Sequence, residues 1–346
     1  MKATAADTPA EIGLDEVCAR HRAADDIAVM PHSRPDGDCV GSAAALVLIL
    51  REMGKRAFLV LCDPLPERLR FIARPVLSPG ADDGCFGVPA LPLDFTPHYV
   101  VTVDCAEAKL LGAFELLYPR IDLKIDHHPP RSQFARENCV DTSAASCGEI
   151  IYRVAERLGY CTPDICEPLY AAIISDTGSF RYSAVSSETH RIAGNIIDMG
   201  VVHDRIHERL FGQRGPRELA ALRLALNNLS YREIGGYLVA LLAITNETKA
   251  EYGLDDDDLG ELNSFPRDIR GVAMGVTVKQ STAQPGLYKI SVRTGEELDS
   301  SAVCMLMNGG GHVRASGAAV AAGDMESALG IIFENIEKVI YGKQNE

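Results

Sequence analysis

The sequence predicts an α/β protein whose N-terminal part is a mostly parallel sheet with helices on both faces. Short apolar runs typical of buried strands alternate with helix-like segments over about 180 residues. Polar residues capable of chemistry follow several of these runs, at the sheet edge where parallel α/β proteins bind their ligands. A helical connector and a smaller C-terminal α/β domain are expected to follow.

Length and composition exclude several classes of protein. The chain has 346 residues, of which 47% are hydrophobic and 24% charged, enough for two globular domains. No apolar run approaches the roughly 20 residues that span a bilayer. A net charge of −14 disfavours binding of long duplex nucleic acid. Ten cysteines without a CxxC pair predict reduced thiols and a cytoplasmic protein.

The first domain is expected over residues 11–190. A Ser146-x-x-Glu149 capping box should open one of its helices. A further apolar segment, 170–175, ends in Asp176. The expected elements are helices over 14–24, 43–53 and 147–159 and strands over 27–30, 57–61, 99–103 and 123–125.

The rest of the chain is expected to form a helical connector over 191–230 and a second domain over 231–346. The connector segment is helical in pattern and more charged than what precedes it. The second domain should contain strands over 237–244, 271–279 and 287–293, a glycine-rich segment over 307–320 and a final helix over 325–340.

A set of imidazoles and carboxylates predicts a divalent metal site. In the stretch PHSRPDGDCVGS, Pro35 and Gly37 allow a sharp turn that aims several side chains inward. Carboxylates and imidazoles without an evident thiolate ligand favour Mn²⁺, with Mg²⁺, Co²⁺ or Fe²⁺ as alternatives. The residues that fall just after apolar segments are His32, Asp36, Asp38, Asp104, His127, His128 and Asp176.

These residues resemble motifs of a known enzyme family. His32-x-x-x-Asp36-x-Asp38, Asp104, Asp126-His127-His128 and Asp176 look like the first four motifs of the DHH phosphoesterase superfamily. GGGH at 309–312, with Arg314, Ser316 and Gly317 after it, resembles the signature of the DHHA1 domain. The resemblance covers about residues 11–342 and is nearest to the NrnA-like group of oligoribonucleases, which also dephosphorylate 3′-phosphoadenosine 5′-phosphate (pAp).

The resemblance implies two divalent cations. One would be bound by His32, Asp36 and Asp104, and the other by Asp38, Asp104, His127 and Asp176. Two such ions activate a water molecule and stabilise the charge that develops on a phosphate. His128 would face the substrate phosphate as a hydrogen-bond donor or a proton source, and Asp126 would orient the histidines.

The resemblance also implies a set of substrate-binding residues. Backbone amides of a glycine-rich segment can approach a phosphate closely, and guanidinium groups suit its oxygens. The implied residues are Arg181, Arg293, Gly309, Gly310, Gly311, His312, Arg314 and Ser316, together with His128. The family commonly has Asn where this chain has Arg34, a difference that can alter substrate preference near the metals.

The leading hypothesis is a metal-dependent phosphoesterase that degrades short RNA to 5′-mononucleotides and removes the 3′-phosphate of pAp-like nucleotides. The alternatives are a phosphodiesterase of cyclic dinucleotides or their linear products, and a RecJ-like single-strand exonuclease. From a different class, the chain could be a nucleotide- or RNA-binding module without catalysis. A homodimer is implied by the resemblance alone, and neither a membrane nor a long duplex is expected as a partner.

Overall fold

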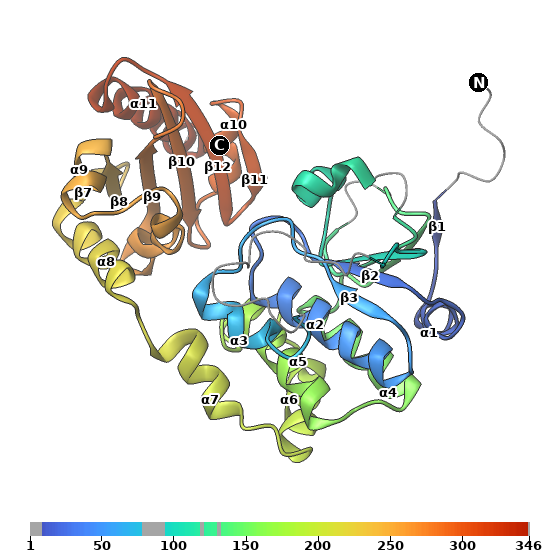
Figure 1. Ribbon diagram of the computed structural model, residues 1–346. Coiled ribbons are helices and arrows are strands. Elements are labelled where there is room, and N and C mark those ends of the chain that lie inside the picture. Colours follow the sequence, from blue (N-terminus) through green and yellow to red (C-terminus); the bar gives the residue numbers. More distant parts are fainter. Residues whose placement is uncertain (1–8, 78–93, 118–120, 130–132, 345–346) are drawn as a thin grey trace, which may run out of the picture. The chain divides into compact units, whose positions relative to one another are not determined.

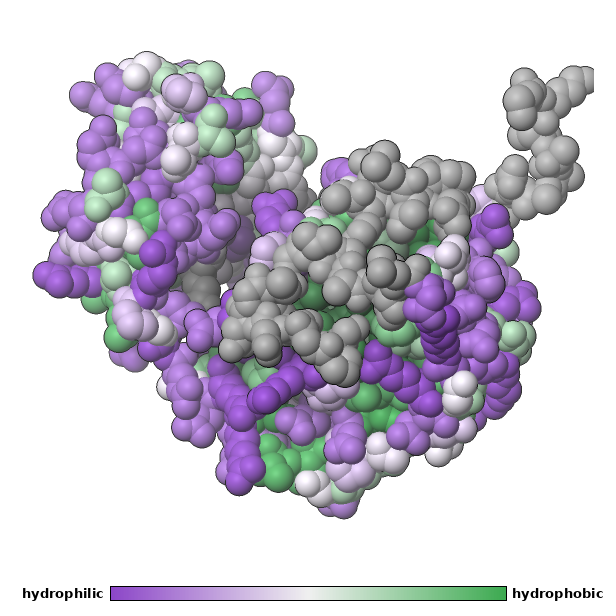
Figure 2. Space-filling model, viewed as in Figure 1, coloured by the Kyte–Doolittle hydropathy of each residue, from purple (hydrophilic) through white to green (hydrophobic). Residues whose placement is uncertain are grey.

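The computed structural model describes residues 9–77, 94–117, 121–129 and 133–344. The chain divides into two compact units, Met1–Gln213 and Arg214–Glu346. None of the described helices has the length and apolar content needed to cross a bilayer. On the face that Figure 2 shows, most residues of each unit are hydrophilic, and the hydrophobic ones lie in small groups between them.

The first unit contains a six-stranded parallel sheet with the strand order β1-β6-β5-β4-β2-β3. This confirms the predicted fold class (Figure 1). The strands are β1 (Ala10–Glu11), β2 (Ile27–Met30), β3 (Ala57–Leu59), β4 (Tyr99–Val103), β5 (Leu123–Asp126) and β6 (Glu137–Val140).

Helices and helical turns account for most of the remaining described residues of this unit. They are α1 (Leu14–Ala23), α2 (Gly37–Glu52), η1 (Glu67–Leu69), α3 (Arg70–Ala73), η2 (Ala108–Leu117), α4 (Cys147–Leu158), α5 (Pro163–Asp176), α6 (Ser187–Asp198), α7 (His203–His207) and the π-helical η3 (Glu208–Gly212).

The larger core of the first unit lies between the sheet and helices α2, α4 and α5. Ile27, Val101 and Ile125 point into it from the strands. A smaller core on the opposite face includes Met30, from β2, and Leu111, from η2. Alternate residues of each buried strand therefore serve two cores, which explains why these strands are apolar almost throughout.

Close helix packing in the larger core depends on glycine. A Cβ atom added at Gly41 of α2 would lie 2.4 Å from the Pro168 carbonyl oxygen of α5. One added at Gly37 would lie 2.3 Å from the Ser175 hydroxyl oxygen. Gly148 of α4 approaches α5 in the same way, at Ala172. The glycines thus bring α5, including its last residue Asp176, close to the start of α2.

The second unit is a six-stranded sheet in the order β11-β12-β10-β9-β8-β7, with only the β8–β9 pair parallel. Helices α10 and α11 pack on one face, and α8 packs on the other. The elements are α8 (Pro216–Asn228), β7 (Leu229–Ile234), β8 (Tyr237–Ile244), α9 (Asn246–Glu251), η4 (Asp257–Leu259), η5 (Glu261–Asn263), η6 (Phe265–Asp268), β9 (Val272–Gln280), β10 (Leu287–Thr294), α10 (Ser300–Met305), β11 (Gly310–His312), β12 (Ala315–Ala321) and α11 (Met325–Gln344).

Three sequence expectations differ from the structure. Helix α2 begins at Gly37, not at 43, because Asp36 accepts a hydrogen bond from the Cys39 amide and caps the helix. The apolar segment 170–175 is the second half of helix α5, so Asp176 follows a helix and not a strand of the sheet. The glycine-rich segment contains β11, paired with β12 in a hairpin, where a phosphate-binding loop was expected.

Candidate active site

Six of the predicted side chains in the first unit meet in one cluster. His32 and Asp36 follow β2, Asp104 follows β4, and His127 follows β5. Asp38 lies in the first turn of α2, and Asp176 ends α5. The cluster therefore lies at the carboxyl ends of three neighbouring parallel strands and at the ends of two helices.

Asp104 lies between the two halves of this cluster. Its Oδ2 atom is 3.7 Å from His32 Nε2, and its Oδ1 atom is 3.5 Å from His127 Nε2. His32 Nε2 also lies 3.7 Å from Asp36 Oδ2. On the other side, His127 Nε2 is 3.8 Å from Asp38 Oδ2 and 3.3 Å from Asp176 Oδ2. The two oxygens of one carboxylate thus face two separate sets of ligands.

The backbone places Asp104 in an unusual conformation. Its φ angle is 54°, in the left-handed region that aspartate tolerates better than most residues. Its amide donates to the Ile125 carbonyl of the neighbouring strand. The turn directly after β4 is therefore fixed by β5, and it directs a nearly buried carboxylate into the cluster.

Both histidines in the cluster are oriented by backbone carbonyls. His32 Nδ1 lies 2.7 Å from the Ser33 carbonyl oxygen, and His127 Nδ1 lies 3.3 Å from that of Ala144. When Nδ1 carries the hydrogen and donates to these carbonyls, Nε2 of the neutral ring has a free lone pair. Nε2 is the atom that faces the carboxylates. This is the arrangement in which proteins present histidine to a metal ion.

Two atoms at the centre of the cluster have no partner. Asp104 Oδ1 and His127 Nε2 are buried and make no hydrogen bond with any residue that the structure describes. Buried polar atoms are normally paired, and leaving them unpaired costs free energy. A divalent cation coordinated by both atoms would satisfy them, so the donor set fits such an ion.

The electrostatics of the cluster point the same way. Burial, together with the Asp104 and Asp176 carboxylates, raises the pKa of Asp38 well above its usual range. Burial also raises the pKa of Asp176 to about 6. Burial disfavours the protonated form of His127, but the surrounding carboxylates outweigh it and raise its pKa to about 10. Carboxylates this crowded need compensating positive charge, from protons or from cations.

Asp38 is fixed by the start of helix α4. Its Oδ2 accepts from the Cys147 amide at 2.7 Å, and its Oδ1 accepts from the Gly148 amide at 2.9 Å. The Ser42 hydroxyl donates to Oδ1 as well. Ser146 caps this helix by accepting from the Glu149 amide, but the Glu149 carboxylate accepts from Arg153 and not from the Ser146 amide, so the predicted capping box is half formed. The N-terminal amides of the helix thus hold the Asp38 carboxylate beside His127.

His128 and Asp126 form a separate pair next to the cluster. Asp126 is fully buried, and its Oδ1 lies 2.9 Å from His128 Nδ1 and accepts from the His128 amide at 3.1 Å. The hydrogen bond that His128 Nδ1–H donates to the Asp126 carboxylate raises the pKa of His128. The His128 side chain is 43% exposed, and its Nδ1 lies 3.4 Å from Asp104. Because Nδ1 is bound to Asp126, Nε2 is the atom left to meet a substrate.

Two arginines near the cluster occupy the motif loops. Arg34 is exposed and has a φ angle of 51°, a conformation that asparagine adopts more readily. Its amide donates to Asp63. Arg181, in the loop after Asp176, donates from Nε to the Gly178 carbonyl. Both guanidinium groups lie on loops that begin or end at predicted ligands.

The predicted substrate-binding residues of the second unit lie together at β10, β11 and β12. Arg293 donates to the carbonyls of Val292 and Ser316. Arg314, in the hairpin turn, donates to the Gly295 carbonyl. The Ser316 hydroxyl is buried and donates to the Ser300 carbonyl at 2.6 Å. Gly310, Gly311 and His312 are exposed, whereas a side chain at Gly309 would collide with β12.

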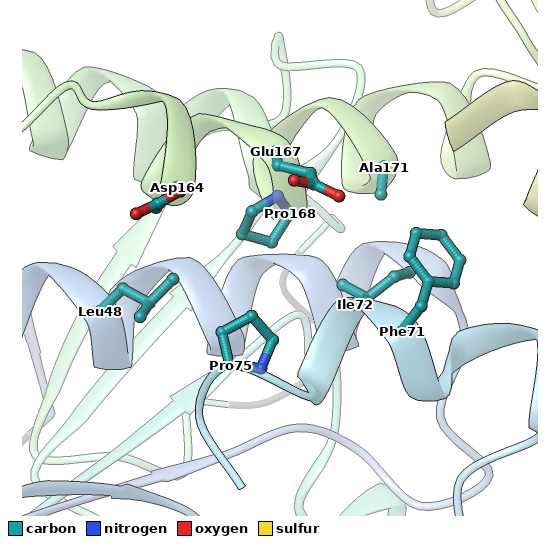
Figure 3. A pocket seen from close by; sticks show the side chains of 8 residues that line it. All are labelled: Leu48, Phe71, Ile72, Pro75, Asp164, Glu167, Pro168 and Ala171. Carbon is teal, nitrogen blue, oxygen red and sulfur yellow. The ribbon is translucent and has the colours of Figure 1, made fainter. Parts of the chain in front are cut away.

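A cavity elsewhere in the first unit is separate from this cluster. It has a volume of about 280 Å³ and lies between α2, α3 and α5, where Leu48, Phe71 and Pro168 line it (Figure 3). Leu48 is ten residues beyond Asp38 on α2, which corresponds to about 15 Å along a helix. The carboxylates of Asp164 and Glu167 also line this cavity.

The first unit thus combines a parallel α/β sheet with histidine and aspartate side chains that follow its strands. Residues 26–173 match the model of the DHH family, N-terminal domain. The enzyme class this indicates is a phosphoesterase, a hydrolase.

A relative and two solved structures extend the comparison. The chain is 27% identical over 314 residues to the bifunctional oligoribonuclease and PAP phosphatase NrnA of Thermus thermophilus, covering 90% of this chain and 89% of that one. An exopolyphosphatase-related protein from Bacteroides fragilis superposes with a TM-score of 0.81 at 22% identity, covering 95% and 96%. RecJ of Thermus thermophilus in complex with Mn²⁺ superposes with a TM-score of 0.54 at 15% identity. This match covers 95% of this chain and 54% of RecJ. At these identities the two structures show the fold alone.

One residue of this region was not anticipated from the sequence. Lys124 lies on β5, two residues before Asp126, and is fully buried beside it. A lysine within an otherwise apolar strand was the available signal. The run 123–125 was interpreted as an ordinary strand because its neighbours are apolar.

Proposed function

We propose that the chain is a metal-dependent phosphoesterase that hydrolyses short oligoribonucleotides to 5′-mononucleotides and removes the 3′-phosphate of pAp-like nucleotides. The observation that carries the proposal is Asp104, whose two carboxylate oxygens face His32 on one side and His127 on the other. The NrnA relative of Thermus thermophilus, similar over most of both chains, supports these substrates.

The residues fit two divalent cations. His32, Asp36 and Asp104 would hold one, and the other would be held by Asp38, Asp104, His127 and Asp176. Ligand atoms of the first three lie within 4.8 Å of one another, as do those of Asp38, His127 and Asp176. Oxygen and imidazole ligands favour Mn²⁺, with Mg²⁺, Co²⁺ or Fe²⁺ as alternatives. Bound there, the cations supply a water molecule of lowered pKa and charge compensation for the phosphate.

The chain's own groups have three tasks in this mechanism. The helix α4 amides hold Asp38 in place, so one wall of the site is rigid before substrate arrives. His128 faces the substrate with Nε2, from which a proton passes to the leaving oxygen as the P–O bond breaks. In the second unit, the exposed amides around Gly310 and Gly311, with His312, would bind a terminal phosphate. Arg181, Arg293 and Arg314 complete the proposed substrate set, whereas the buried Ser316 hydroxyl donates to the Ser300 carbonyl and stabilises the backbone there.

The test is a product profile. Purified protein with Mn²⁺ is incubated with labelled RNA of 2 to 24 nucleotides, with pAp, with linear pApA and with a cyclic dinucleotide. We expect cleavage of the shortest RNA and release of phosphate from pAp, both lost on chelation and restored by Mn²⁺. Cleavage of long single strands in preference to dinucleotides would favour the RecJ-like alternative. Absence of any cleavage, with nucleotide binding retained, would favour a binding module.

A further inference from the structure

Two buried lysines of this chain are each paired with an aspartate, and the two pairs differ in how the ammonium group is bound. In the second unit, Lys249 donates to Asp256, to the Gln280 carbonyl and to the Thr282 hydroxyl. Three acceptors match the three donors of an ammonium group. This pair therefore has the hydrogen bonds that a buried charge requires, and it serves the fold of α9 and β9.

The second pair, Lys124 and Asp126, lacks such support. Both side chains are fully buried, and Lys124 Nζ lies 3.5 Å from Asp126 Oδ2. Among the described residues, Asp126 is its one hydrogen-bond partner, and the Phe134 ring lies 5.3 Å from Nζ. Lys124 thus lies near a member of the smaller apolar core, which contains Phe134. A buried ammonium with so few partners costs stability compared with an apolar side chain.

The position of Lys124 connects it to the reacting end of the site. Lys124 and Asp126 are alternate residues of β5, so both point to the same face of the sheet. Lys124 contacts Oδ2 of the Asp126 carboxylate, while Oδ1 binds His128 Nδ1 and the His128 amide. The three side chains form a row from the apolar core to the exposed His128 ring.

We propose that Lys124 is a positioning residue that fixes the Asp126 carboxylate and, through it, the orientation of His128. The charge of Lys124 keeps Oδ2 directed inward, so that Oδ1 stays available to His128 and the ring presents Nε2 to the substrate. The inference rests on the proposed function, because it assumes that His128 Nε2 gives its proton to the leaving oxygen. In that step water oxygen bonds to phosphorus, the bond to the leaving oxygen breaks, and the proton goes from Nε2 to that oxygen.

The test compares two substrates that differ in their need for this proton. The leaving sugar oxygen of the dinucleotide pApA is a poor leaving group without protonation, whereas the p-nitrophenyl ester of 5′-AMP releases a stable phenolate. The quantity measured is the ratio of kcat/KM on the dinucleotide to kcat/KM on the ester. This ratio does not depend on how much of a variant is folded, because both substrates report on the same folded molecules.

For Lys124→Met we expect the ratio to fall about tenfold to a hundredfold, a part of the roughly hundredfold to ten-thousandfold that a positioned proton donor contributes. Lys124→Arg, which keeps the charge, should restore most of the ratio. Lys249→Met removes the other buried ammonium and should reduce stability while leaving the ratio unchanged. In a Lys124→Met, His128→Asn double variant, the ratio should fall no further than in His128→Asn alone.

The outcomes distinguish the proposed proton transfer by His128 from the proposed positioning role of Lys124. If His128→Asn leaves the ratio unchanged, the proposed role of His128 in proton transfer is wrong. If His128→Asn lowers the ratio but Lys124→Met slows both substrates equally, Lys124 acts only on stability and the inference is overturned. A lowered ratio in Lys249→Met would equally contradict it, since the Lys249 ammonium is bound by Asp256, Gln280 and Thr282 and not by Asp126.

Discussion

The two units differ in how their predicted functional side chains are bonded. In the first unit, Asp104 and His127 carry buried atoms without partners among the described residues. In the second unit, the Ser316 hydroxyl and the Arg314 guanidinium already donate to backbone carbonyls. Buried polar atoms without hydrogen-bond partners can still bind a ligand. Side chains whose donors are already bound to backbone carbonyls stabilise the local backbone instead. In the second unit, Ser316 and Arg314 are thus already engaged in the fold.

The largest effect is expected for Asp104→Asn, which tests whether the unpaired side chains of the first unit bind a cation. Asparagine tolerates the left-handed backbone at this position but removes the charge that faces both histidines. We expect kcat/KM on a dinucleotide with Mn²⁺ to fall about a thousandfold, equal to about 4 kcal/mol of barrier. Calorimetry should show weakened Mn²⁺ binding as well. The exposed Asp164→Asn variant is the control, and equal loss in both would contradict the assignment.

His21 can be compared with His127, because it is a buried histidine whose pKa is shifted by burial alone and not by neighbouring carboxylates. Both ring nitrogens lack partners among the described residues, and burial lowers its pKa to about 4. The unfolded chain binds the proton more readily, so this histidine destabilises the fold as pH falls from about 6.5 toward 4. We expect His21→Leu to gain about 2 to 3 kcal/mol in free energy of unfolding at pH 4.5 relative to pH 7.5.

Denaturant unfolding of both proteins at the two pH values measures this gain. A difference between His21→Leu and the unsubstituted chain that is the same at both pH values would show that His21 does not titrate as its environment implies. Taken with His127, whose pKa is raised by carboxylates, the result would show that unpaired nitrogens mark a ligand site only when acidic groups face them.

Gly37→Ala tests whether helix packing sets the cluster geometry. The new Cβ atom would lie 2.3 Å from the Ser175 hydroxyl, next to Asp176. We expect a loss of about 1–3 kcal/mol of stability and weaker Mn²⁺ binding, since α5 must shift. Gly194→Ala on α6 is the matched control, because its Cβ atom would meet open space. It should stabilise the helix by about 0.5–1 kcal/mol. Unchanged Mn²⁺ affinity in Gly37→Ala would show that the site tolerates a displaced α5.

Ser316→Ala is expected to have the smallest effect, and it tests the second unit. Removing the hydroxyl leaves the Ser300 carbonyl without this donor, which should cost about 1–2 kcal/mol of stability. KM for a dinucleotide should change less than about threefold, a difference below 1 kcal/mol. A large rise in KM at unchanged stability would instead support the substrate-binding role that the sequence predicted.

The sequence predicted the cluster well because its residues obey a topological rule. His32, Asp104 and His127 all follow apolar strands, and parallel strands bring such positions to one edge. Strand β6 was not predicted, since the sequence of Glu137–Val140 has too few apolar residues to show a pattern. Asp176 was predicted from its motif, but its helix could not be distinguished from a buried strand by apolar character alone.

Tertiary contacts explain what the sequence did not reveal. The hairpin at Gly310–His312 depends on pairing with β12, which compensates for the poor strand preference of glycine. The buried Lys124 beside Asp126 lies near Phe134, a residue that no local sequence pattern connects to it. The polar partners of Asp38 are backbone amides, which sequence does not display.

The hydrogen bonds from the helix α4 amides to Asp38 have a consequence for interpreting related sequences. Each oxygen of this carboxylate accepts a backbone N–H, so an amide nitrogen at either position would face a donor and repel it. A descendant of this fold that had given up hydrolysis would still be under pressure to keep aspartate here. Asp104 and His127, which the described fold leaves unbonded at the centre, are free of that pressure. Their loss, and not the persistence of Asp38, is what would distinguish an inactive homologue from a working enzyme.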